Sequence, residues 1–165
     1  MLAYFRNDVG FQRFGLVVQA LFAHVLLRLG GNVLDVKNPG HPDIRAMLSG
    51  QLYYIEVETA QGKTLPRQLD QGDLDALQAL DEGEQGYFCV LDCGPPIEWL
   101  CVDVASLGGR AGGELRMSLL RGYSNRDLSL DCTAEFSHLV INEARNLNQL
   151  TYAQLRQEAL SGCPR

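Results

Sequence analysis

The feature that most constrains the fold is a short alternating segment that follows a turn signal. Residues 53–58 are rich in aromatic and β-branched side chains, which favours a β-strand. Ser49 and Gly50 before this segment are residues typical of a turn. We therefore expect residues 43–48 to form the first arm of a β-hairpin whose second arm carries residues 53–58.

Three acids are expected to meet on this hairpin. Side chains alternate along a strand, so Glu56 and Glu58 point the same way, with Cα atoms roughly 6.5–7 Å apart. Antiparallel pairing would return Asp43 to the end of the second arm, where the glutamates lie. Such crowded carboxylates repel one another unless a cation or shared protons neutralise them. Because oxygen ligands suit Mg²⁺ or Mn²⁺ better than zinc, the pattern predicts a divalent metal site.

The same segment resembles the PD-(D/E)XK nuclease superfamily, which has the restriction-endonuclease-like fold. In that superfamily an aspartate precedes a strand that carries an acid, one spacer and a lysine. Pro42 and Asp43 match the first element, and Glu56 and Val57 match the acid and the spacer. The resemblance implies that Asp43 and Glu56 bind one or two Mg²⁺ (or Mn²⁺) ions, with the Val57 carbonyl as a candidate further ligand.

Two positions depart from the pattern of the superfamily. Glu58 stands where the lysine is expected, although some active members carry glutamate there, and Lys63 is a candidate for a displaced lysine. Many members also have a glutamate on the first helix, and the nearest counterpart here is Gln19, which supplies no charge. The resemblance implies hydrolysis of DNA phosphodiester bonds, with Glu58 accepting a proton from water or positioning the metal, and Lys63 stabilising the phosphate.

Periodicity along the chain predicts an α/β fold with the element order of the superfamily core. Apolar residues recur at helical spacing over residues 10–29, and Gly30–Gly31 would end that helix. We expect a central mixed β-sheet flanked by helices in the order α-β-β-β-α-β, followed by C-terminal strands and a helix. The further segments are a strand at 32–37, a helix between Thr64 and Gly83, strands at 87–91, 97–104 and 136–141, and a last helix at 151–160.

Composition bounds the kind of protein. A chain of 165 residues suits one domain, which we divide into a core of about residues 10–104 and a C-terminal elaboration of about residues 105–165. No apolar stretch predicts a membrane span and no signal peptide is visible, so a cytoplasmic location is the expectation. The five cysteines form no zinc pattern and are expected to be reduced, buried thiols.

Charge leaves the type of partner open. The net charge is −6, yet residues 1–70 hold seven Lys and Arg against six acids, while residues 71–165 hold seven against fourteen. Basic residues near the acids could line a path for the phosphates of DNA. The candidates for that path, besides Lys63, are Lys37, Arg45 and Arg67.

Three interpretations therefore stand. The first is a metal-dependent nuclease, for which a homodimer would place two sites on a duplex. The second is an inactive module with the nuclease fold that serves as a binding or regulatory subunit, with the acidic C-terminal half contacting a protein partner. The third is an unrelated α/β domain in which Asp43 and Glu56 do not converge.

Overall fold

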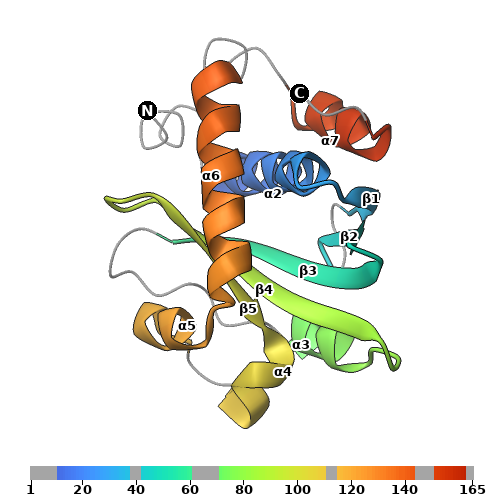
Figure 1. The fold of residues 1–165 in the computed structure, drawn as a ribbon, viewed down its shortest axis with the longest axis vertical. Coiled ribbons are helices and arrows are strands. Elements are labelled where there is room, and N and C mark those ends of the chain that lie inside the picture. Colours follow the sequence, from blue (N-terminus) through green and yellow to red (C-terminus); the bar gives the residue numbers. More distant parts are fainter. Residues whose placement is uncertain (1–10, 38–41, 61–70, 111–114, 144–150, 163–165) are drawn as a thin grey trace.

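The computed structural model describes residues 11–37, 42–60, 71–110, 115–143 and 151–162. Among these residues, all strands lie in the first part of the chain together with α2 and α3, and the last part is helical (Figure 1). In chain order the elements are α2 (Phe11–Arg28), β1 (Asn32–Val36), β2 (Ile44–Leu48), β3 (Gln51–Ala60), α3 (Gln71–Gln78), β4 (Glu84–Asp92), β5 (Glu98–Asp103), α4 (Val104–Leu107), the 3₁₀ helix η1 (Gly108–Arg110), α5 (Met117–Tyr123), α6 (Arg126–Glu143) and α7 (Tyr152–Leu160).

The five strands form one mixed sheet in the order β1-β2-β3-β4-β5. Strand β3 is parallel to β4, and the other three neighbouring pairs are antiparallel. Two parallel neighbours need a crossover connection, which here contains α3. The expected α/β class with a mixed sheet flanked by helices is therefore confirmed.

The predicted hairpin turn is also confirmed. Ser49 has φ 53° and Gly50 has φ 80°, and these two residues alone separate Leu48 from its partner Gln51. Positive φ at both residues of a two-residue loop is typical of a type I′ turn, whose twist suits antiparallel strands. The turn fixes the pairing register of β2 and β3, and the register in turn decides which side chains meet.

The first helix ends at two glycines, as the sequence predicts. Gly30 N donates to Leu27 O at 3.0 Å, Gly31 N donates to Leu26 O at 2.9 Å, and Gly30 has φ 81°. This pair of bonds is a Schellman motif, which closes the last helical turn. A Cβ atom on Gly31 would lie 2.8 Å from Leu26 O, so any other residue there would force the backbone apart.

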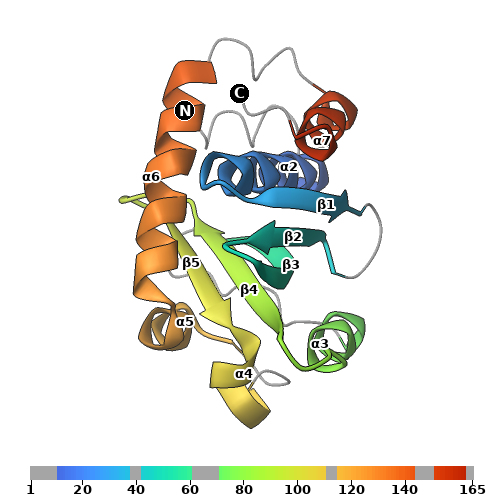
Figure 2. The ribbon, with the colours of Figure 1, turned by 45° about the vertical axis from the view of Figure 1, so that its right-hand side comes forward.

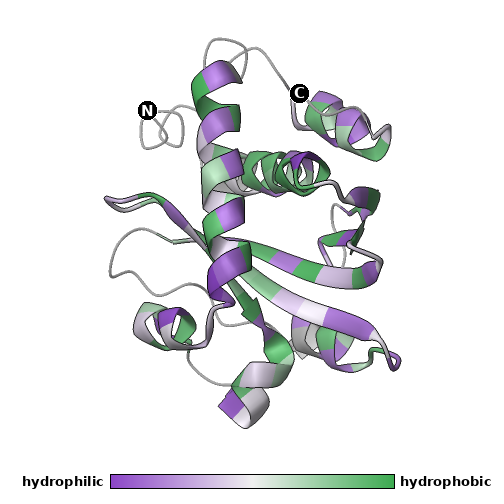
Figure 3. Cartoon of the chain, in the orientation of Figure 1, coloured by the Kyte–Doolittle hydropathy of each residue, from purple (hydrophilic) through white to green (hydrophobic). Residues whose placement is uncertain are grey.

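Helices cover both faces of the sheet and create two apolar cores (Figures 1 and 2). Helices α2, α6 and α7 pack on one face, whereas α3, α4 and α5 pack on the other. Helix α2 lies between the sheet and the two outer helices, so it is apolar around most of its circumference (Figure 3). His24 of α2 is buried, with Nε2 3.0 Å from Leu155 O, so it is a packed residue of the helix interface.

Helix α6 covers the outer edge of the sheet. Trp99 N of the edge strand β5 donates to Thr133 Oγ1 at 2.8 Å, and Cys101 N donates to Ser129 Oγ at 2.9 Å. These hydroxyls satisfy backbone groups that an edge strand would otherwise offer to another chain. A dimer formed by extending the sheet through this part of β5 is therefore disfavoured.

The C-terminal part is more helical than expected, because α4, α5 and α6 were not predicted. Residues 136–141 were expected to form a strand, but they belong to α6. Their apolar side chains suit a strand over a short window, whereas the buried positions Cys132, Phe136 and Leu139 recur at spacings of four and three, which is helical.

The last helix is confirmed, and Thr151 caps it with Gln154 in a capping box. Within the described residues no helix meets the length and hydropathy needed to cross a membrane.

Candidate active site

The pairing of β2 with β3 brings two of the predicted site residues together. Ile44 pairs with Ile55, so the next residues along the two strands, Asp43 and Glu56, lie opposite each other on one face of the sheet. The Asp43 Oδ2 atom accepts a hydrogen bond from Val57 N at 2.9 Å. This bond holds the Asp43 carboxylate against β3, at the point where Glu56 projects from the strand.

Glu56 is almost completely buried. Its side chain lies on the face that packs against α3, α4 and α5, and the residue is only 5% exposed. Burial, then the negative charges of Asp43 and Asp73, and then a hydrogen bond with Asp43 raise the pKa of Glu56 to about 10. The two facing carboxyl groups therefore hold a shared proton at neutral pH, as expected for acids in such close contact.

Asp73 is a third acid near this pair that the sequence does not reveal. It lies in the first turn of α3, and its charge contributes to the raised pKa of Glu56. Acids are common in the first turn of a helix, where they interact favourably with the helix dipole. The position of Asp73 in the sequence therefore does not indicate that it belongs to the site. Only the packing of α3 against β3 and β4 brings it near the carboxyl pair.

Gln19 contributes to the site by positioning the backbone. It is 3% exposed in α2, and its Nε2 atom donates to Lys37 O at 2.8 Å and to Asp43 O at 3.2 Å. Lys37 N also donates to Asp43 O at 2.8 Å. The neutral amide thus ties the end of β1 to the start of β2, and it fixes the backbone that carries Asp43. The resemblance suggested only that a charge is missing here, and this role was not predicted.

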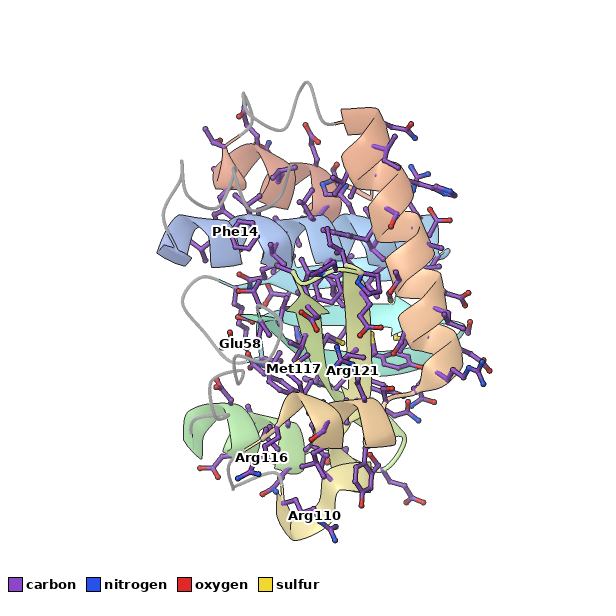
Figure 4. The ribbon with its side chains drawn as sticks, turned by 90° about the vertical axis from the view of Figure 1, so that its left-hand side faces the viewer. Phe14, Glu58, Arg110, Arg116, Met117 and Arg121 are labelled. Carbon is purple, nitrogen blue, oxygen red and sulfur yellow. The ribbon has the colours of Figure 1, made fainter. Side chains whose placement is uncertain are left out.

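Glu58 lies two residues beyond Glu56 on the same face and is partly exposed. In the view of Figure 4 it lies between α2, which carries Phe14, and α5, which carries Met117 and Arg121. The parallel register pairs Glu58 with Val90, so the next β4 residue on this face is Asp92. Glu58 is more exposed to solvent than the buried Glu56.

A cation reaches this face of the sheet from α5. Arg121 donates to Asp92 Oδ2 at 2.6 Å and to Glu98 Oε1 at 2.8 Å, and Asp92 is 2% exposed. Asp92 Oδ1 also accepts from Gly94 N at 2.9 Å. An ion pair and a backbone hydrogen bond to described residues therefore help to compensate the buried carboxylate. Sequence reasoning missed this pair because 29 residues separate its members and no motif joins them.

The predicted cations fall in different places. Arg45 shares its sheet face with Asp43 and pairs across the strands with Tyr54. A hydrogen bond to Glu84 raises the pKa of Tyr54, and Arg45 opposes that shift. Lys37 follows the end of β1, where its backbone contacts the residue that begins the hairpin. Lys63 and Arg67 lie outside the described residues.

The donor set is suited to a hard divalent ion, although it is incomplete among the described residues. Asp43 and Glu56 offer carboxylate oxygens, and a metal would replace their shared proton as the neutralising charge. Across the described ranges, no group of three or more His, Cys, Asp or Glu side chains is arranged to hold a metal ion. Of the five cysteines expected to be buried thiols, three are buried, Cys93 is only half-buried, and Cys163 lies outside the described residues; burial raises the pKa of Cys89. The three buried thiols are Cys89, Cys101 and Cys132.

Two cavities bounded by described residues lie away from the carboxyl pair. One, of about 480 Å³, lies between α3, α4 and the start of β4, and is lined by Leu77, Glu84 and Asp103 among others. The other, of about 350 Å³, lies between β5, α5 and α6. Neither contains Asp43 or Glu56, so the site is defined by its acids rather than by one of these hollows.

Comparison with known proteins leaves the family open. No family model, curated protein or solved structure gives a significant match. The interpretation of the site therefore depends on the chemistry and geometry of its residues.

Proposed function

We propose that the protein is a metal-dependent nuclease with a restriction-endonuclease-like fold that hydrolyses phosphodiester bonds in DNA. The observation that carries the proposal is the contact between Asp43 and β3, which places Asp43 beside Glu56. The element order α2-β1-β2-β3-α3-β4 and the parallel pairing of β3 with β4 support it, because they agree with the core expected for that fold.

In this proposal Asp43 and Glu56 hold Mg²⁺ or Mn²⁺. When bound there, such an ion would polarise the scissile phosphate, lower the pKa of a water molecule and neutralise charge on the leaving oxygen. The N–H and C=O groups of one strand residue point in the same direction, so the Val57 carbonyl lies on the Asp43 side of β3, where the Val57 N–H bonds Asp43. Val57 can then supply a third oxygen from the backbone.

Two further side chains have roles that follow from their position. Glu58 is the partly exposed acid next to the pair, so it accepts the proton released by the attacking water. Arg45 lies on the same face of the sheet. In the pattern of the superfamily a lysine stands where this chain has Glu58, and Arg45 takes the role of that lysine by donating a hydrogen bond to a phosphate oxygen. Lys63 remains a second candidate for that role, and its position lies outside the described part of the chain.

The direct test is cleavage of supercoiled plasmid and branched DNA in Mg²⁺ or Mn²⁺. Wild-type protein is compared with Asp43→Ala and Glu56→Ala, and with Glu82→Gln as a control that removes an exposed carboxylate. We expect cleavage by the wild type and the control, and a loss of at least 10²-fold in both site variants, since each removes a metal ligand. Equal activity in all four proteins would refute the assignment.

A second candidate function is a binding or regulatory module that retains the fold without catalysis. The raised pKa of Glu56 favours it, because a proton on Glu56 already removes one of the two negative charges of the pair. Gln19, which supplies no charge, is consistent with the same view. Titration with Mn²⁺ separates the two functions, because only the nuclease requires metal binding that depends on Asp43 and Glu56.

A further inference from the structure

One segment of the acidic half of the chain is basic. Residues 71–165 hold seven Lys and Arg and fourteen Asp and Glu, yet residues 104–126 contain four of these cations and one of these acids. The acid is Glu114, and the cations are Arg110, Arg116, Arg121 and Arg126. A local excess of positive charge in a chain of net charge −6 concentrates any attraction for anions on this segment.

The fold places this segment on the same side of the sheet as the candidate active site. Val104 of α4 and Met117 and Leu120 of α5 pack into the core that contains Phe88 and Val90 of β4. Those two strand residues pair in register with Glu56 and Glu58. Helices α4 and α5 therefore cover the same face of the sheet from which Glu56 and Glu58 project, and Figure 4 shows Glu58 and three of the arginines from one side of the molecule.

The arginines on this surface are accessible. Arg110 and Arg116 are both exposed, and the Arg121 side chain is 47% exposed although it pairs with Asp92. Tyr123 is 37% exposed, and the Arg110 guanidinium lies 5.8 Å from the centre of its ring. Exposed arginines beside an exposed aromatic ring form a surface that attracts phosphates and offers a face for stacking a base.

We propose that the exposed surface of α4, η1 and α5, which we call the arginine face, binds the phosphate backbone of nucleic acid through Arg110 and Arg116. The proposal deepens the proposed nuclease function, on which it rests, by stating where DNA lies relative to Asp43 and Glu56. An acidic protein segment is the competing ligand, but the exposed Tyr123 ring beside Arg110 favours nucleic acid. Residues 71–103 and 127–165, which flank this segment in the chain, hold thirteen acids and three cations, so they repel a polyanion.

The test is the salt dependence of DNA binding measured by fluorescence anisotropy. A fluorescein-labelled DNA duplex is titrated in EDTA with wild type, with Arg110→Gln/Arg116→Gln, and with Arg28→Gln/Arg156→Gln. The last variant removes the same charge from α2 and α7 on the other side of the sheet. Unfolding midpoints establish that all three proteins fold.

We expect the slope of log K against log salt to fall by about 1.8 in Arg110→Gln/Arg116→Gln, since each lost phosphate contact removes about 0.9. The control pair should keep the wild-type slope. Equal slopes in all three proteins would overturn the proposal. The proposal would also be overturned if Arg110→Gln/Arg116→Gln abolished the binding of labelled polyglutamate and left DNA binding unchanged. That result would identify an acidic protein segment as the ligand.

The binding assay is independent of catalysis because EDTA removes divalent metal. A reduced slope together with no cleavage in Mg²⁺ would support the arginine face and refute the nuclease. Cleavage in Mg²⁺ together with an unchanged slope would support the nuclease and refute the arginine face. The two proposals can therefore fail separately.

Discussion

Replacing Glu56 with glutamine should stabilise the protein increasingly as the pH rises. Glu56 is 5% exposed, and burial together with the charges of Asp43 and Asp73 raises its pKa to about 10 from an ordinary value of 4.5. Glutamine has nearly the same shape as a protonated glutamate, and its amide can still donate to Asp43. The Glu56→Gln variant therefore keeps the contacts of the protonated state and removes its dependence on pH.

The sign and size of the effect follow from proton linkage. Between the two pKa values the folded protein holds one more proton than the unfolded chain, so this group makes folding less favourable as the pH rises. Its contribution is independent of pH below 4.5, where both states are protonated, and again above 10, where both are ionised. The slope between these limits is about 1.4 kcal/mol per pH unit, so the wild type should lose on the order of 3 kcal/mol relative to Glu56→Gln between pH 6 and pH 8.

Urea unfolding at several pH values measures this difference. Other titrating groups are common to both proteins, so the difference in unfolding free energy isolates the Asp43–Glu56 pair. Glu82→Gln serves as the control, because Glu82 is exposed and its removal should leave the wild-type pH profile unchanged. A constant difference between wild type and Glu56→Gln over this range would show that Glu56 is already ionised at pH 6, which would refute the shared proton.

Three further predictions concern the support of the site. Gln19→Leu removes two hydrogen bonds from a buried amide, so urea unfolding should show a loss of about 1–3 kcal/mol, and an unchanged stability would contradict the positioning role. Arg121→Leu leaves the buried Asp92 without its ion pair, and we expect a loss of about 1–2 kcal/mol, since the arginine is half exposed. The same experiment on Arg121→Leu/Asp92→Asn should recover part of that loss. Iodoacetamide labelling located by mass spectrometry should modify the buried thiols only after unfolding, and rapid labelling of the native protein would contradict their burial; these thiols are Cys89, Cys101 and Cys132.

The sequence is sufficient to predict the local elements around the hairpin. Ser49 and Gly50 adopt the positive φ angles that their turn requires, and Gly30 and Gly31 end the first helix. The opposition of Asp43 and Glu56 follows from these local signals, because a short turn fixes the register of both arms. Strand periodicity then decides which side chains share a face.

Features that depend on contacts distant in sequence are not predictable in this way. The strand expected at residues 136–141 is part of α6, since a six-residue apolar window suits either structure and only the longer spacing of buried positions distinguishes them. The Arg121–Asp92 ion pair and the proximity of Asp73 to Glu56 both require the packing of helices on the sheet. No periodic pattern in the sequence records those contacts.

The measurement that tests the central claim most directly is calorimetric titration of Mn²⁺ at neutral pH in two buffers of different ionisation enthalpy. If Asp43 and Glu56 exchange their shared proton for a metal ion, binding should release about one proton per ion, and the buffers should give different apparent enthalpies. The account predicts that Asp43→Asn and Glu56→Gln abolish this binding, while Glu82→Gln retains it. Absence of Mn²⁺ binding in the wild type, or binding that persists in both site variants, would contradict the account.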